Sequence, residues 1–210
     1  MTVTDSSGAS DLDLVRRAQA GDAEAFGELV ERNRRAVFRA ALAAVGSAAE
    51  ADDVSQEAFV TAYRKLSGFR GEAAFRTWLL AITWRKAIDR RNSMTRLLRR
   101  TVTPGDSGDG APDILDNAPA PGRSQEDELA AAQLQRTLRR LIASLPKKLR
   151  DALLLAGSGE YSYEQISGML GAPVGTVKWR VSEARRLLKQ KLAALGHAVP
   201  ASERASARTR

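Results

Sequence analysis

The chain has 210 residues, a formal net charge of +8 and a pI of about 10.3, so it can form one domain or two small ones and is basic enough to bind a polyanion. It has no cysteine, which excludes disulfides, thiolate metal sites and a cysteine nucleophile. No apolar run is long enough to span a membrane, and the polar start predicts no signal peptide. We expect an all-α, cytoplasmic protein that uses no cofactor and no metal.

The first block, residues 11–100, is predicted to form a small helical domain after a disordered start at residues 1–10. Apolar residues recur at helical spacing in four segments, of which the last is AAFRTWLLAITWRKAIDRRN. The residues that would cap or break these helices are Ser10 with Asp13, Gly21, Asp22, Gly46 with Ser47, and Gly68. Four amphipathic helices of this size can enclose one core.

The composition changes sharply at residues 101–128, which we interpret as a flexible linker. The part from Thr103 to Glu128 holds four of the seven prolines, seven acidic residues and one basic residue. Such a segment buries too little apolar surface to fold by itself.

The third block, residues 129–195, is predicted to be a second helical domain, followed by a disordered tail at residues 196–210. Its cap and turn residues are Pro146, Ser162 with Gln165, and Gly171 to Pro173. They divide the block into helices of which the last two form a short helix, a tight turn and a longer basic helix. This is the helix-turn-helix pattern, in which the second helix enters the major groove of DNA.

The long basic helix separates its residues onto two sides. The side expected to pack on the scaffold consists of Val177, Val181, Ala184 and Leu188. The side expected to face DNA consists of Lys178, Trp179, Ser182, Arg186 and Lys189. Glu183 is expected to accept a hydrogen bond from a cytosine amino group. The alternatives are a solvated basic helix, and for Trp179 a packing role.

Four motifs in this order resemble the extracytoplasmic-function (ECF) sigma factors, the two-domain promoter-recognition subunits of bacterial RNA polymerase. The motifs are AGDAEAFGELVERN, EADDVSQEAFVTAYRKLSGFRG, AFRTWLLAITWRKAIDRRN, and LPKKLRDALLL with YSYEQISGMLGAPVGTVKWRV. The resemblance covers about residues 11–195. It implies a protein that is not an enzyme, but binds core RNA polymerase and directs promoter-specific transcription initiation by recognising and melting promoter DNA.

The resemblance also implies partners. The N-terminal domain would bind the clamp of the largest polymerase subunit, and the C-terminal domain would bind the flap of the second-largest subunit. The polymerase-binding residues would be Asp52, Asp53, Gln56 and Glu57, for which the alternative is an ordinary solvated acidic face. An anti-sigma factor is a further expected partner. The linker either enters the polymerase cleft as an acidic mimic of RNA or is a solvated spacer.

The promoter contacts that the resemblance implies fall into two sets. The upstream element would be read by Thr176, Lys178, Trp179, Ser182, Glu183, Arg186 and Lys189. The downstream element would be bound and melted by Phe69, Arg70, Trp78, Trp84, Arg85, Lys86, Arg90 and Arg91. Aromatic side chains stack on unpaired bases, and basic side chains contact phosphates. Phe75 and Trp78 lie on an apolar stripe that favours core packing, whereas Trp84 projects away from it and either stacks on a base or packs on a neighbouring helix.

The chain departs from the family pattern at Arg85, Pro173 and Glu183, so the preferred promoter sequence is not predicted. Two rival functions are a polymerase-independent helix-turn-helix regulator and a metal-dependent hydrolase that uses Asp52, Asp53 and Glu57. The single histidine, His197, lies in the predicted tail and argues against the hydrolase.

Overall fold

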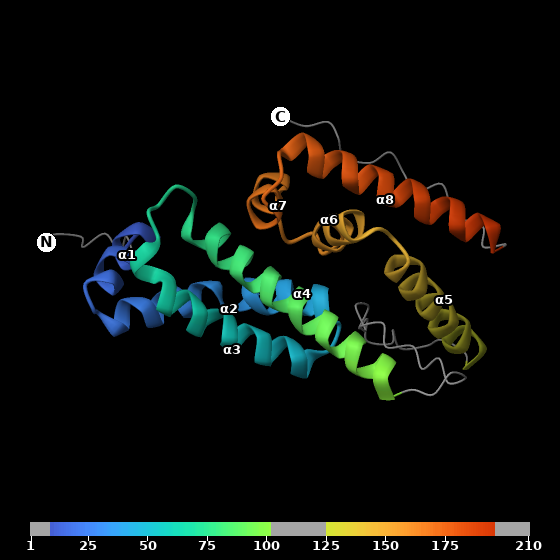
Figure 1. The fold of residues 1–210 in the computed structure, drawn as a ribbon, viewed down its shortest axis with the longest axis horizontal. Helices are drawn as coiled ribbons and strands as arrows, with labels where there is room; N and C mark the ends of the chain where they lie inside the picture. The colour runs from blue at the N-terminus through green and yellow to red at the C-terminus, as the bar shows by residue number, and fades with distance from the viewer. Residues whose placement is uncertain (1–8, 102–124, 196–210) are drawn as a thin grey trace, which may run out of the picture.

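The computed structural model describes residues 9–101 and 125–195, and the secondary structure of both ranges is helical (Figure 1). The N-terminal helices are α1 (Asp11–Gln19), α2 (Ala23–Val45), α3 (Ala48–Lys65) and α4 (Phe75–Thr101), with a 3₁₀ turn, η1, at Leu66–Gly68. The C-terminal helices are α5 (Gln125–Ala143), α6 (Lys147–Gly157), α7 (Tyr163–Leu170) and α8 (Val174–Ala194). The all-α prediction is confirmed for these ranges. Within them, no helix combines the length and the apolar composition that a membrane span requires.

The helix boundaries of the N-terminal domain follow from local capping chemistry. The Ser10 hydroxyl accepts the backbone N–H of Asp13, and the Asp22 carboxylate accepts the N–H of Ala25, so each satisfies a donor in the first turn of its helix. Gly46 ends α2 at a φ of 74°, a left-handed conformation that glycine adopts without the Cβ clash of other residues. These predicted caps are confirmed.

The two boundaries next to the predicted linker differ from expectation. The helix α4 continues to Thr101, past the predicted end at Asn92, because the intervening residues include neither glycine nor proline to stop it. The helix α5 begins at Gln125, so residues 125–128 are helical and not part of a linker. Most of the predicted linker and the predicted disordered ends lie outside the described residues, at 102–124, 1–8 and 196–210.

The C-terminal domain contains the predicted helix-turn-helix, made by α7 and α8. Ser162 and Gln165 form the predicted capping box, with the Ser162 hydroxyl accepting the Gln165 N–H and the Gln165 side chain accepting the Ser162 N–H. Gly171 then ends α7 in the left-handed conformation, at a φ of 58°, and turns the chain into α8. The local sequence therefore determines both the start and the end of α7.

The two domains pack against each other, which the sequence did not predict. The helix α7 contacts α4, and α6 contacts α2 (Figure 1). One continuous buried apolar cluster includes Leu79 and Leu80 of α4 together with Leu155 of α6 and Ile166 of α7. The helix α8 lies on the outer side of the C-terminal domain, against α6 and α7 (Figure 1). This packing covers one side of α4 and leaves one side of α8 open.

Candidate nucleic-acid and partner interfaces

The helix α8 presents a cationic and aromatic face to solvent. Its buried side consists of Val177, Val181 and Ala184, as predicted, while Leu188 is only partly buried. Its exposed side consists of Lys178, Trp179, Ser182, Arg186 and Lys189, also as predicted. The Trp179 side chain is 61% exposed, although tryptophan is among the side chains that gain most from burial. This face has the shape and charge to enter a major groove.

The turn before α8 determines how this face is presented. The Ser167 hydroxyl donates to the Ala172 carbonyl at 2.6 Å and closes the turn. Pro173 occupies the N-cap position and supplies no side-chain acceptor to the first turn of α8. The first-turn N–H groups, with the partly exposed Thr176 beside them, can therefore donate hydrogen bonds to a phosphate oxygen.

Three of the predicted base-reading side chains are engaged within the protein. Arg186 donates from Nε and Nη2 to the two carboxylate oxygens of Glu183, at 2.8 and 2.7 Å, and these bonds lower the pKa of the Glu183 carboxyl. The Lys178 ammonium lies 5.7 Å from the centre of the Tyr163 ring. In this arrangement Glu183 orients Arg186. The capacity of the Glu183 carboxylate to accept a hydrogen bond from a base is already partly used.

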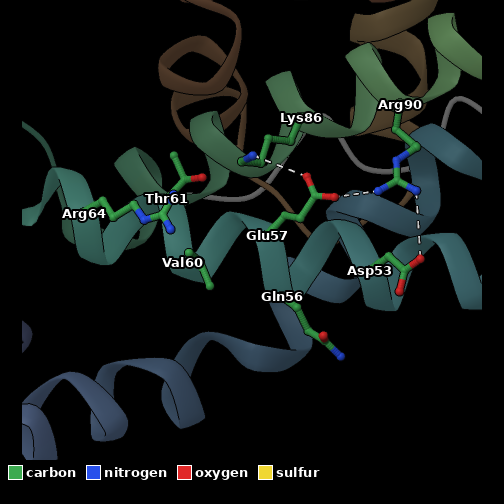
Figure 2. A pocket seen from close by; sticks show the side chains of 8 residues that line it. All are labelled: Asp53, Gln56, Glu57, Val60, Thr61, Arg64, Lys86 and Arg90. Carbon is green, nitrogen blue, oxygen red and sulfur yellow. Dashed lines mark hydrogen bonds and ion pairs between the residues drawn. The ribbon is translucent and has the colours of Figure 1, made fainter.

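The predicted polymerase-binding acids share a charge network with basic residues of α4. Arg90 donates to Glu57 at 2.6 Å and to Glu50 at 3.0 Å, and it lies 3.9 Å from Asp53. Lys86 lies 3.4 Å from Glu57, which is thus held between two cations (Figure 2). Partial burial opposes ionisation of Glu57, but the bonds from Arg90 and Lys86 outweigh it and lower the pKa of this carboxyl. We call these five residues the α3–α4 network.

An open hollow between α3 and α4 adjoins this network. Its lining consists of Asp53, Gln56, Glu57, Val60, Thr61, Arg64, Lys86 and Arg90. The Gln56 side chain points away from the Glu57 carboxylate (Figure 2), and Asp52 and Val60 are exposed nearby. Within the described ranges, no group of three or more His, Asp or Glu side chains is arranged to hold a metal ion.

The predicted downstream-promoter residues divide into exposed and covered groups. Arg70 and Arg85 are exposed, whereas Lys86 and Arg90 are partly covered by the α3–α4 network. Phe69 is buried and packs edge-on against Phe75, with ring centres 5.9 Å apart. The aromatic cluster is completed by the partly buried Trp78, whose ring centre lies 5.0 Å from that of Phe69.

Trp84 and Arg91 are buried, although both are among the predicted downstream-promoter contacts. Trp84 is 3% exposed, so of the two alternatives for this side chain the structure has the packing one. Arg91 is 8% exposed and donates to Asp151 at 3.2 Å and to the Ala44 carbonyl at 3.4 Å. The reason is that the C-terminal domain packs on the side of α4 that a single amphipathic helix would leave to solvent.

Three further residues shape these surfaces, and none of them is among the site residues predicted from the sequence. Glu50 completes the α3–α4 network, and its spacing of three residues from Asp53 could have placed both on one helical face. Asp151 directly precedes the apolar run of α6 at residues 152–156 and is buried, and a carboxylate is rarely buried without a partner. The Tyr161 hydroxyl donates to the Ala36 carbonyl at 2.8 Å, and no sequence pattern indicated that bond.

Comparisons with known proteins agree with this geometry. Residues 29–100 match the family Sigma-70 region 2, and residues 135–188 match Sigma-70, region 4. The chain is 37% identical to the RNA polymerase sigma-H factor of Pseudomonas aeruginosa, over 87% of this chain and 93% of that protein. It is 35% identical to the ECF RNA polymerase sigma-E factor of Escherichia coli strain K12, over 85% of this chain and 92% of that protein.

The fold is similar to that of a solved sigma factor structure. The structure of CnrH in complex with the cytosolic domain of CnrY has a TM-score of 0.57 and 25% identity, over 89% of this chain and 99% of that chain. An N-terminal region 2 domain and a C-terminal region 4 helix-turn-helix together define a sigma factor of the sigma-70 class. The chain belongs to the ECF sigma factors, which bind bacterial core RNA polymerase and direct it to initiate transcription at specific promoters.

Proposed function

We propose that the exposed face of α8 reads the upstream promoter element and that α4 binds and melts the downstream element. The observation that carries this proposal is the division of α8 into a buried apolar side and an exposed cationic side with Trp179. Arginine and lysine bond guanine edges or phosphates, and a helix-turn-helix brings such a face into the major groove. On α4 and the segment before it, Arg85 and Arg70 are the exposed members available for a first contact.

The polar face of α3 is the proposed site for the clamp of the largest polymerase subunit. Asp52, Gln56 and Val60 are exposed on it, next to the carboxylates of the α3–α4 network. A basic partner surface would compete with Arg90 for Glu57, so binding would alter the charge that α4 presents to DNA. The C-terminal domain is the proposed site for the flap of the second-largest subunit.

The remaining parts of the proposal follow from the family. The protein acts in the cytoplasm with the polymerase and is not itself an enzyme. An anti-sigma factor is its proposed regulator, supported by the likeness to CnrH, a protein whose structure was solved in complex with the cytosolic domain of CnrY.

The test is reconstitution of the protein with bacterial core RNA polymerase and genomic DNA of the same organism, followed by mapping of transcript starts. We expect initiation at a small set of promoters that share an upstream element. Lys178→Glu should lower initiation at these promoters about 10-fold or more, because a good base contact discriminates by about 1–3 kcal/mol. Arg34→Glu makes the same change of charge on the exposed surface of α2 and should leave initiation unchanged.

One result would contradict the proposal. If the free chain bound the same promoters as tightly and specifically as the complex with polymerase, the rival interpretation of a polymerase-independent regulator would replace it.

A further inference from the structure

One side chain of α1 holds the start of the connection between α3 and α4. Gln19 is the last residue of α1, and its side-chain Nε2 donates to the Leu66 carbonyl and to the Phe69 carbonyl, both at 2.9 Å. The Phe69 backbone N–H also donates to the Leu66 carbonyl, at 3.0 Å, and closes the turn η1. An amide nitrogen carries two protons and a carbonyl oxygen has two lone pairs, so all three bonds can form together. Gln19 therefore fastens η1 to a helix that lies 47 and 50 residues earlier in the chain.

A second residue of α1 lies beside the same connection further along. Leu12 and Gln19 are seven residues apart, about two turns, so they occupy one side of the helix. A Cβ atom placed on Gly71 would lie 3.7 Å from Leu12 Cδ2. Gly71 has a φ of 74°, a left-handed conformation that favours glycine. The helix α1 thus lies along the start of the connection, at η1 and at Gly71 (Figure 1).

The part of the connection that follows Phe69 is exposed and not helical. We call residues 70–74 the α3–α4 loop; all five are exposed, and the loop lies between the buried Phe69 and Phe75. Arg70, a predicted downstream-promoter contact, lies 3.8 Å from Glu72 in a solvent-exposed pair. Such a pair is weak, so a phosphate can replace Glu72 as the partner of Arg70. Because the loop has no helical ladder of its own, its position depends on how its two ends are held.

The two ends of the α3–α4 loop are held in different ways. Phe69 and Phe75 pack edge-on in the core, which fixes the ends by apolar contact. At the Phe69 end, the bond from Gln19 also fixes the carbonyl from which the loop departs, and so sets its direction. Gln19 itself is exposed, whereas Leu14 and Val15 anchor α1 in the core. The hydrogen bonds of Gln19 can therefore be removed without removing the packing of α1.

We propose that Gln19 is a positioning residue for promoter melting, which holds the α3–α4 loop in the conformation that binds unpaired bases of the downstream element. The inference rests on the proposed promoter role of α4 and of the segment before it. A loop that is ordered in advance loses less conformational entropy when DNA binds, so it binds more strongly. The helix α1 precedes residues 29–100, which match Sigma-70 region 2, so this role belongs to a part of the chain outside that match.

The experiment removes the two donors of Gln19 and measures promoter opening with core polymerase. Gln19→Met keeps nearly the same length and shape but cannot donate. The template is a promoter recovered by the transcript mapping above, used as a duplex and as a copy whose downstream element is already unpaired by mismatched strands. We expect opening of the duplex to fall about fivefold, the scale of one net hydrogen bond. Initiation on the unpaired copy, at saturating protein, should stay close to the wild-type level, because that template no longer requires strand separation.

A matched control and a rescue variant separate positioning from general damage. Gln133→Met makes the same change at an exposed position of α5 and should leave both templates unaffected. Gln19→Lys restores donors, because an ammonium group can donate to both carbonyls, and should recover most of the duplex opening. Ala20→Lys in the Gln19→Met background adds the same charge at the neighbouring exposed position and should not recover it.

The outcomes separate this inference from the proposed function. Normal duplex opening by Gln19→Met, an equal loss on both templates, or recovery through Ala20→Lys overturns the positioning role alone. The first result would make the bonds of Gln19 dispensable, the second would indicate general damage, and the third would assign the effect to charge. A wild-type protein that directs no initiation with core polymerase overturns the proposed function, and the positioning role with it.

Discussion

Glu57 of α3 and Arg90 of α4 are hydrogen-bonded, with Arg90 Nη2 2.6 Å from Glu57 Oε1, so a residue expected to bind polymerase holds a cation expected to contact the promoter. Lys86 binds the same carboxylate from the other side. A partner that binds one of these charged side chains must weaken the bonds of that side chain to the other two. We therefore expect polymerase binding and DNA binding to be energetically coupled in this domain.

The first prediction tests that coupling. Glu57→Gln removes the charge that holds Lys86 and Arg90, and should free both cations for phosphate contacts. Non-specific DNA binding by the free protein should become more salt-dependent, with a log–log slope steeper by about 0.9 for each added phosphate contact. The measurement is the dissociation constant for a random duplex over a series of salt concentrations.

Glu31→Gln is the matched control, because the partner of Glu31 among the described residues is Arg34, in an exposed pair on α2. Equal slopes for the Glu57 and Glu31 variants would contradict the coupling.

Acidification should act in the same direction as Glu57→Gln. The pKa of Glu57 is lowered in the folded protein. Its ion pairs therefore stabilise the protein fully when the pH is above the ordinary glutamate pKa of about 4.3, and this stabilisation is lost as the pH falls through the folded pKa.

The second prediction concerns Glu183, which accepts two bonds from Arg186. If its role is to orient Arg186, Glu183→Ala should reduce discrimination among upstream elements about 10-fold without weakening polymerase binding, because a bidentate arginine contact is worth about 1–3 kcal/mol of discrimination. Promoters selected from a randomised pool by the variant and the wild-type complex provide the measurement. Gln190→Ala is an exposed control on the same helix, and identical selected sequences for all three proteins would exclude Glu183 from readout.

The third prediction concerns the capping box of α7. Ser162→Ala removes the acceptor for the Gln165 N–H and should lower the free energy of unfolding by about 1 kcal/mol. Unfolding in urea, followed by circular dichroism, measures this change. Ser67→Ala at an exposed position of η1 should shift the free energy by less than about 0.5 kcal/mol. A similar loss for the two variants would mean that the cap contributes nothing specific.

The fourth prediction is a loss of stability in alkali. Burial, together with the charge of Glu160, raises the pKa of the Tyr161 phenol above its ordinary value of about 10. The neutral phenol therefore stabilises the folded state fully below about pH 10, and this contribution is lost as the pH rises, because the unfolded chain ionises first. Urea midpoints between pH 8 and pH 11 should fall for the wild-type protein.

Tyr161→Phe should cost about 1 kcal/mol at neutral pH, because the bond to the Ala36 carbonyl is lost, and should reduce the alkaline fall. The exposed Tyr63 offers the control: Tyr63→Phe leaves Tyr161 in place and should retain the fall. An alkaline fall of the same size in the Tyr161 variant would assign it to other groups.

Local features of this protein could be read from the sequence. Ser10, Asp22, Ser162 and Gly171 act where predicted, because a helix cap depends on groups within three or four residues along the chain. The two sides of α8 were predicted for the same reason, since helical periodicity alone separates Val177 and Val181 from Lys178 and Trp179. The order of four motifs likewise sufficed for the family.

The surroundings of the α4 residues were decided only by the tertiary structure. Arg90 bonds Glu50 and Glu57 from 40 and 33 residues away, and Arg91 bonds Asp151 from 60 residues away. Helical periodicity states which side of a helix a residue occupies, but not whether solvent, DNA or a second domain covers that side. Trp84 and Arg91 have the residue types of a DNA contact, and they are buried because the C-terminal domain packs on α4, through contacts between segments far apart in the chain.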